Sequence, residues 1–271
     1  MSFFGTFGII MAVAVCGGWS AGMLGFYIIG LRMPFIAVFA AHAAMAGAVF
    51  GDLAGLDHTL SGFAGALAGA AVLGLILRSR DIDPNAALGS LFSLMMGLAF
   101  LGIGLNPGPK SSLLGLMWGS LLFVDAMQLT IMAIVASLLT VAVFVFEKEL
   151  KAILFSRELS SYIMKSGIVM FGVLISAAGV IAVNLETVGG LLLYSLIANP
   201  AVAALRLSRS YRSALLTSSL FGTISALGGF MGAYWFDLPI GACIVLVSST
   251  IVGVSFIISH LRTRGTHHVI Q

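Results

Sequence analysis

Charged side chains are scarce in this chain of 271 residues, because Asp, Glu, Lys and Arg together make up only 8% of it. Soluble globular domains carry about 25% of these residues, so the composition excludes an ordinary soluble protein. Cysteine is also rare, with 2 residues in the whole chain. Cys16 and Cys243 both lie inside apolar segments, which predicts small buried thiols and not a disulfide or a metal-binding pair.

The motifs that would indicate an enzyme are missing as well. The sequence has no Gly-x-x-x-x-Gly-Lys-Ser/Thr loop for nucleotide phosphates and no His-Glu-x-x-His zinc motif. We therefore expect no enzymatic activity and no bound cofactor, and any ATP hydrolysis that serves this chain would occur on a partner subunit. The net charge of +3 does not indicate nucleic-acid binding, because the basic residues lie in short connections between apolar runs.

Hydrophobic residues, in contrast, make up 60% of the chain, and the mean hydropathy is +1.13. This predicts an all-α, polytopic transmembrane bundle that forms a single domain over residues 1–271, in contact with membrane lipid. A shorter apolar stretch at 112–123 predicts a re-entrant or interfacial helix. No charged segment precedes the first run, so we expect no cleavable signal peptide. Nine runs of roughly spanning length occur at about 7–29, 33–51, 58–78, 86–104, 127–147, 164–183, 188–204, 212–235 and 239–260.

The charges indicate an orientation. Nine spans place the termini on opposite sides, and a cytoplasmic C-terminus leaves Lys110 as the one basic residue outside, as the positive-inside rule favours. The N-terminus is then outside. Several acidic residues fall on the same outer side, so the outer face would attract cations. Their carboxylates can also be ordinary helix caps. The acidic residues predicted to form this outer vestibule are Asp52, Asp57, Asp125, Glu186 and Asp237.

The run from Met33 to Phe50 contains one ionisable side chain, His42, at its midpoint. Because desolvating a polar group without a hydrogen bond costs on the order of a few kcal/mol, His42 needs a partner or a water-filled path. The residues around it are mostly alanine and glycine, which suits close helix packing or a narrow conduit. A packing histidine bonded to a neighbouring carbonyl is the alternative.

Glycine and proline predict how the helices pack and bend. Pro200, beside Asn199, predicts a kinked or broken helix of the kind that lines transporter pathways, although proline kinks also occur in membrane helices without such a role. Glycines four residues apart predict close helix crossings. They are Gly18/Gly22, Gly65/Gly69, Gly115/Gly119 and Gly228/Gly232.

The longest inner connection, at about 147–165, differs from the others because it is amphipathic. Leu150, Ile153 and Leu154 recur at helical spacing, and Glu147 and Lys151 form an i, i+4 pair. The pattern predicts a short helix that lies on the membrane surface or docks on a cytoplasmic partner.

Several segments in order resemble the permease subunits of bacterial ABC importers for zinc, manganese and iron. Residues 32–51 are similar to the family's signature helix, in which Arg and Met precede a central His. The family's Leu-Phe-Gly segment resembles residues 113–122, and its ATPase-contacting segment resembles residues 147–159. Its Val-Gly-x-Leu-Leu segment resembles residues 188–204, and its Leu-Pro-x-Gly-x-x-Ile-Val-Leu pattern resembles residues 237–249.

One departure from the family pattern affects the metal site. Family members place an Asp four residues before the central His, and this chain has Val38 there and Ala41 where a Ser is common. Only His42 is therefore expected as a metal ligand from this motif, and one imidazole binds a transition metal weakly. Either a partner subunit or another residue supplies the missing ligand, or the cargo is not a bare ion. The candidates in this chain are Met45, Asp57 and Glu186.

The resemblance implies an importer permease of the bacterial cytoplasmic membrane. It would pair with a cytoplasmic ABC ATPase and an extracytoplasmic metal-binding protein, and would dimerise with itself or a paralogous permease. The alternatives are a permease for a chelated metal or organic cofactor, a standalone secondary transporter or channel, and a non-transporting scaffold.

His267 and His268 are predicted to belong to a disordered end of the chain. The residues expected to couple to the ATPase are Glu149, Leu150, Ile153, Leu154, Phe155, Ser156, Arg157 and Glu158, with Ser156 replacing the family's usual Asp.

Overall fold

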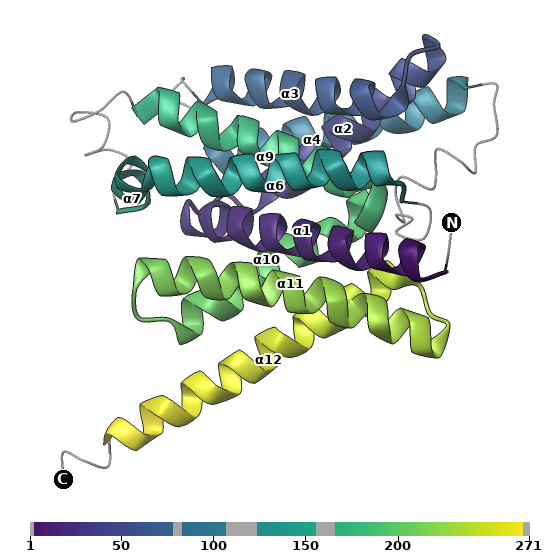
Figure 1. The fold of residues 1–271 in the computed structure, drawn as a ribbon. Coiled ribbons are helices and arrows are strands. Elements are labelled where there is room, and N and C mark those ends of the chain that lie inside the picture. Colours follow the sequence, from purple (N-terminus) through teal and green to yellow (C-terminus); the bar gives the residue numbers. More distant parts are fainter. Residues whose placement is uncertain (1–2, 78–82, 107–123, 156–165, 268–271) are drawn as a thin grey trace.

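The computed structural model describes residues 3–77, 83–106, 124–155 and 166–267. All regular secondary structure in these ranges is helical, and the long helices run side by side (Figure 1). The helices are α1 (Phe3–Gly30), α2 (Phe35–Leu53), α3 (His58–Ile76), α4 (Pro84–Leu105), α6 (Ala126–Val145), α7 (Glu147–Phe155), α9 (Ser166–Val188), α10 (Gly190–Leu207), α11 (Tyr211–Phe236) and α12 (Ile240–His267).

Eight of the described helices are long and apolar enough to cross a membrane, and α10 is a shorter apolar helix. This confirms the predicted polytopic helical bundle. Most helix limits fall within about four residues of the apolar runs, while α9 and α12 continue beyond the predicted ends at 183 and 260, to Val188 and His267. The stretch predicted to form a short helix at 112–123 lies outside the described residues. Figure 1 shows the start of α1 and the end of α12 at opposite ends of the bundle.

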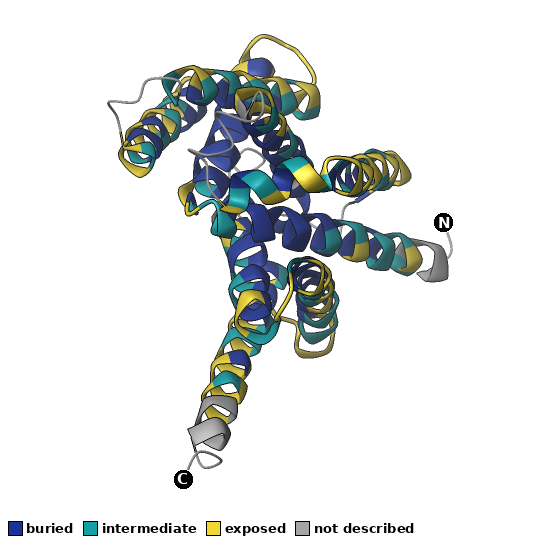
Figure 2. Ribbon diagram, turned by 90° about the vertical axis from the view of Figure 1, so that its left-hand side faces the viewer, coloured by how far each residue is buried: buried dark blue, intermediate teal, exposed yellow. Residues whose placement is uncertain are grey.

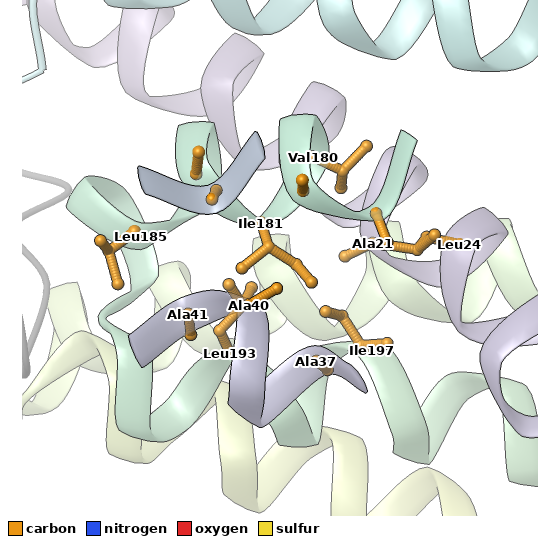
Figure 3. Packing of buried hydrophobic residues seen from close by; sticks show 14 of the residues in the cluster. Ala21, Leu24, Ala37, Ala40, Ala41, Val180, Ile181, Leu185, Leu193 and Ile197 are labelled. Carbon is orange, nitrogen blue, oxygen red and sulfur yellow. The ribbon is translucent and has the colours of Figure 1, made fainter. Parts of the chain in front are cut away.

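The core lies where α1, α2, α9 and α10 meet. In the most apolar 18-residue stretch of α2, 72% of the residues are buried, whereas in that of α6 only 22% are. Helix α2 is therefore central and α6 peripheral. Ala40 and Ala41 of α2 lie in this core with Ile181 of α9 and Leu193 of α10 (Figure 3). Figure 2 shows the buried residues concentrated in the middle of the molecule, while the end of α12 extends away from it.

Glycine allows two pairs of helices to approach backbone to backbone. A methyl group at Gly18 of α1 would lie 2.5 Å from the carbonyl oxygen of Gly222 on α11. A methyl group at Gly47 of α2 would lie 2.7 Å from the Cα of Gly65 on α3. The Gly18 and Gly65 motifs therefore do pack helices closely, whereas Gly232 has nothing within 4 Å of its Cβ direction.

The structure corrects two predictions about helix ends and breaks. Helix α10 is continuous through Pro200, so the helix is not broken there, while a kink at this position stays a prediction. The Asn199 amide donates to Ser248 and Ser249 of α12 at 3.0 and 3.2 Å. A membrane helix tolerates proline when neighbouring helices and side chains satisfy its polar groups. Helix α12 extends through His267, so this residue is helical and not part of a disordered tail.

Candidate functional site

His42 lies in the middle of α2 and is only 3% exposed. Its Nδ1 atom is 2.9 Å from the backbone oxygen of Val38, one turn earlier on the same helix. The imidazole also meets the ring of Phe92 on α4 edge to face, with a centroid distance of 4.9 Å. Helices α2 and α4 thus hold the ring from two sides and fix its direction.

The hydrogen bond to Val38 determines which ring nitrogen can bind a metal. A carbonyl oxygen only accepts, so Nδ1 carries the proton and Nε2 carries the lone pair in the neutral ring. No described residue forms a hydrogen bond with Nε2. Imidazole ligands in metal sites commonly use this arrangement, in which one nitrogen donates to a carbonyl while the other binds the ion.

The side chains predicted to join His42 do not form a complete site in one chain. Met45 is buried on the same helix three residues later, and its part in binding stays a prediction. Helix α2 ends at Leu53, which lies about 16 Å from His42 along the axis because a helix rises about 1.5 Å per residue. Asp57 comes after this end, so it is too far along the chain to join His42 in one site. The described residues contain no group of three or more His, Cys, Asp or Glu that could hold an ion. Glu186 belongs to α9, but its side chain is not among those described.

The vestibule carboxylates in the described part of the chain stabilise helix ends or loops. Asp57 accepts the Leu60 amide at 2.9 Å as N-cap of α3, and Asp125 accepts the Gln128 amide at 2.8 Å in a capping box. Asp52, near the end of α2, accepts the Asn106 side-chain amide at 2.5 Å.

Asp237 ends α11 in a left-handed conformation, with φ of 52°. A non-glycine residue adopts this conformation rarely, and Asp does so more readily than most. The helix-capping interpretation therefore holds for the carboxylates of Asp57 and Asp125, whereas Asp237 ends its helix through its backbone, and all three residues are exposed. Capping does not neutralise the charge, so an attraction for cations at this face stays a prediction.

The amphipathic helix predicted in the longest inner connection is α7. Leu150 and Ile153 are buried, Leu154 is half-buried, and Phe155 is 88% exposed. Glu147 and Lys151 form the predicted ion pair at 2.6 Å. Ser156, Arg157 and Glu158 lie outside the described residues. Most of the apolar face of α7 therefore packs on the chain itself, and Phe155 is its free apolar side chain in the part described.

Arg212 and Asn184 are polar residues that the sequence patterns did not single out. The Arg212 guanidinium donates to both carboxylate oxygens of Glu147 at 2.9 Å. These bonds, together with Lys151, lower the pKa of Glu147 to about 2, so the carboxylate is ionised at neutral pH. Asn184 of α9 is buried, and its Oδ1 has no hydrogen-bond partner in the described structure. The bond from Arg212 joins residues 65 positions apart, so no local pattern signals it, and nothing in the sequence around Asn184 shows that its Oδ1 is left without a partner.

The fold defines a multi-span helical membrane protein, and comparison with known proteins places it in a transport family. Residues 6–259 match the ABC 3 transport family, and this chain belongs to that family. It is therefore a membrane permease, a transport subunit and not an enzyme.

Relatives match over most of the chain. A "Probable metal transport system membrane protein" of Thermotoga maritima is 28% identical over 229 residues, or 84% of this chain and 81% of that protein. The manganese transport system membrane protein MntC of Listeria innocua is 26% identical over 250 residues, or 91% of this chain and 88% of that protein. A structure of PsaBC from Streptococcus pneumoniae in complex with Fab has a TM-score of 0.82 at 23% identity, covering 93% of this chain and 91% of that chain.

Proposed function

We propose that this chain is the permease subunit of an ATP-driven importer for a divalent transition metal in a bacterial cytoplasmic membrane. The observation that carries the proposal is His42, whose Nε2 lone pair is unpartnered among the described residues near the middle of a central helix. Membership of the ABC 3 transport family and the manganese relatives support it, and they favour manganese over zinc and iron as cargo.

In this proposal a cytoplasmic ABC ATPase binds at the end of the bundle that carries α7. An extracytoplasmic metal-binding protein delivers cargo at the opposite end, where Asp57 and Asp125 cap helices. The abundance of basic residues at the α7 end supports a cytoplasmic C-terminus and an outer N-terminus. Because one imidazole is a sparse site, a second permease copy or a paralogous subunit would supply further ligands, and a sparse site also releases its ion readily.

The test is uptake of manganese, zinc and iron into proteoliposomes that contain the chain with its ATPase and binding protein. We expect manganese to accumulate only when ATP is present on the ATPase side. An ATPase variant that binds but does not hydrolyse ATP should abolish accumulation. Uptake without the ATPase, driven by an ion gradient, would instead identify a standalone secondary transporter.

A chelated metal is the second candidate cargo, and Val38 favours it. The family carboxylate is replaced by an apolar side chain one turn from His42, which weakens a site for a bare ion. The same proteoliposomes distinguish the two cargoes, because a chelate importer would accumulate the metal only together with its organic ligand. Double labelling of metal and ligand measures this directly.

Phe155 is expected to contact the ATPase. An apolar side chain that is 88% exposed at the end of a short helix is suited to a groove on a partner. We predict that Phe155→Ala lowers ATP-dependent uptake about tenfold, a loss of about 1.4 kcal/mol in coupling or docking. Copurification of the ATPase with the permease measures docking. Phe236→Ala, at the other end of the bundle and 72% exposed, is the matched control and should change neither quantity.

A further inference from the structure

Helix α7 packs against α9 as well as against α6, which precedes it in sequence, and side-chain contacts also tie it to α11 and α1. Glu147 receives two hydrogen bonds from Arg212, one residue after the start of α11. The Lys151 ammonium lies 4.7 Å from the centre of the Tyr211 ring, a cation–π distance. A methyl group at Gly30, the last residue of α1, would lie 2.7 Å from Leu154 Cδ2. Polar contacts thus bind α7 to α11, and an apolar contact binds it to α1.

Helices α1 and α11 are joined to each other along their whole length. Near the start of α1, the rings of Phe7 and Phe230 meet at an interplanar angle of 53°, with their centroids 5.5 Å apart. In the middle, the Gly18 and Gly222 backbones touch, and the Ser218 hydroxyl donates to the Gly22 carbonyl at 2.6 Å.

At the α7 end of the same pair, the Tyr27 and Tyr211 hydroxyls share a hydrogen bond of 2.5 Å. The ring of Phe26 meets both tyrosine rings edge to face, at 5.3 Å each. Because close backbone packing resists sliding, the two helices are expected to move as one body.

The α1–α11 pair also contacts α10, which shares a core with α2, the helix that carries His42. The backbone of Gly25 on α1 touches the carbonyl of Ile197 on α10, with no room for a side chain between them. Ile197 and Leu24 lie in the same core as Ala37 of α2 (Figure 3). A movement of α1 would therefore press directly on the core around α2.

We propose that Glu147, Lys151 and Leu154 form a clasp through which α7 moves the α1–α11 pair, so that ATPase closure reaches α2 by this route. The inference rests on the proposed function, since it requires α7 to receive movement from an ATPase. The clasp assigns a positioning role to Arg212 and Tyr211, which touch no cargo. Two other routes compete with it. One runs along the chain into α6, which ends at Val145, and the other runs through α9, which packs against both α7 and α2.

The clasp is suited to transmission more than to stability. The Arg212 side chain is 71% exposed and the Glu147 side chain 13% exposed, so water still screens one end of the ion pair and limits its contribution to folding. Its two parallel hydrogen bonds nevertheless fix the relative direction of α7 and α11. The bonds from Arg212 and Lys151 lower the pKa of Glu147 from 4.5 to about 2. The carboxylate is therefore negatively charged at neutral pH, and it becomes protonated only as the pH falls through about 2. The clasp therefore stays closed throughout the physiological range.

The test is the number of metal ions transported per ATP hydrolysed by the full complex. We expect Glu147→Gln and Arg212→Gln each to lower this ratio about fivefold, while the ATPase still copurifies and hydrolyses ATP at an unchanged rate. The double variant should be no worse than Glu147→Gln alone, because that substitution already removes the bonds to Arg212 together with the ion pair to Lys151. The charge exchange E147R/R212E should recover at least half of the wild-type ratio.

The matched controls are Lys148→Gln on α7 and Arg209→Gln just before α11, both exposed, and both should keep the wild-type ratio. Additive losses in the double variant, or an unchanged ratio in both single variants, would overturn the clasp and favour a route through α6 or α9. Loss of ATPase copurification would also overturn it, since Glu147 would then serve docking. A wild-type complex that transports nothing with ATP refutes the proposed function itself, which distinguishes the two failures.

Discussion

His42→Ala is expected to lower metal uptake about 100-fold without preventing assembly of the complex. Removal of groups that support a metal ligand commonly costs 10–100-fold, and loss of the ligand itself should lie at the upper end of that range. The side chain is buried between α2 and α4, so the variant also loses its contact with Phe92. Uptake of manganese in proteoliposomes measures the effect, and the ATPase rate and thermal stability are measured on the same preparation.

Two further variants separate binding from packing. Phe92→Leu changes the wall that His42 contacts but leaves its Nε2 atom, and we expect uptake to fall no more than about threefold. His58→Ala changes an exposed histidine at the start of α3 and should leave uptake unaltered. If His42→Ala transports normally but melts earlier, His42 is a packing residue and the metal route lies elsewhere.

The second large effect concerns the crossing of α1 and α11. Gly18→Leu should prevent folding or lower the melting temperature by more than 10 °C, because its Cβ would lie 2.5 Å from a backbone oxygen of Gly222 and 2.8 Å from the Cα of Thr223. Overpacking usually costs about 1–3 kcal/mol, and here backbone, which cannot move aside as a side chain can, occupies the space.

Gly8→Leu is the matched control for that substitution. It lies on the same helix, yet nothing stands within 4 Å of its Cβ direction. We expect it to be tolerated, and leucine should even favour the helix slightly over glycine. Equal loss of stability in the two variants would mean that glycine matters here for insertion into the membrane and not for the crossing. Fluorescence-detected size exclusion after heating compares them.

Most of the fold was predictable because the bilayer limits the options. Apolar runs of about 20 residues must become helices in hydrocarbon, where each backbone polar group needs an internal partner. Hydropathy therefore located α2 and α9 closely. It could not decide whether Pro200 interrupts α10, and it gave no sign that the Asn199 amide finds its partners on α12, 49 and 50 residues later.

The candidate site was predictable only in part, for the same physical reason. His42 stands out in the sequence because an ionisable side chain in an apolar run is unusual. The Val38 carbonyl that orients its ring is a backbone atom, which every residue possesses, so composition gives no sign of it. The bond between Glu147 and Arg212 joins positions 65 residues apart, and only the folded bundle brings them together.

The aspartates predicted to lie on the outer face have a practical consequence for anyone who maps that face by mutagenesis. Alanine at Asp57 or Asp125 would remove a cap, which costs typically about 1 kcal/mol, together with the charge. An alanine scan there would therefore report weakened helix starts and could be mistaken for lost affinity. Asparagine caps a helix about as well as aspartate but carries no charge. Asp57→Asn and Asp125→Asn are thus the substitutions that isolate electrostatic attraction from local folding.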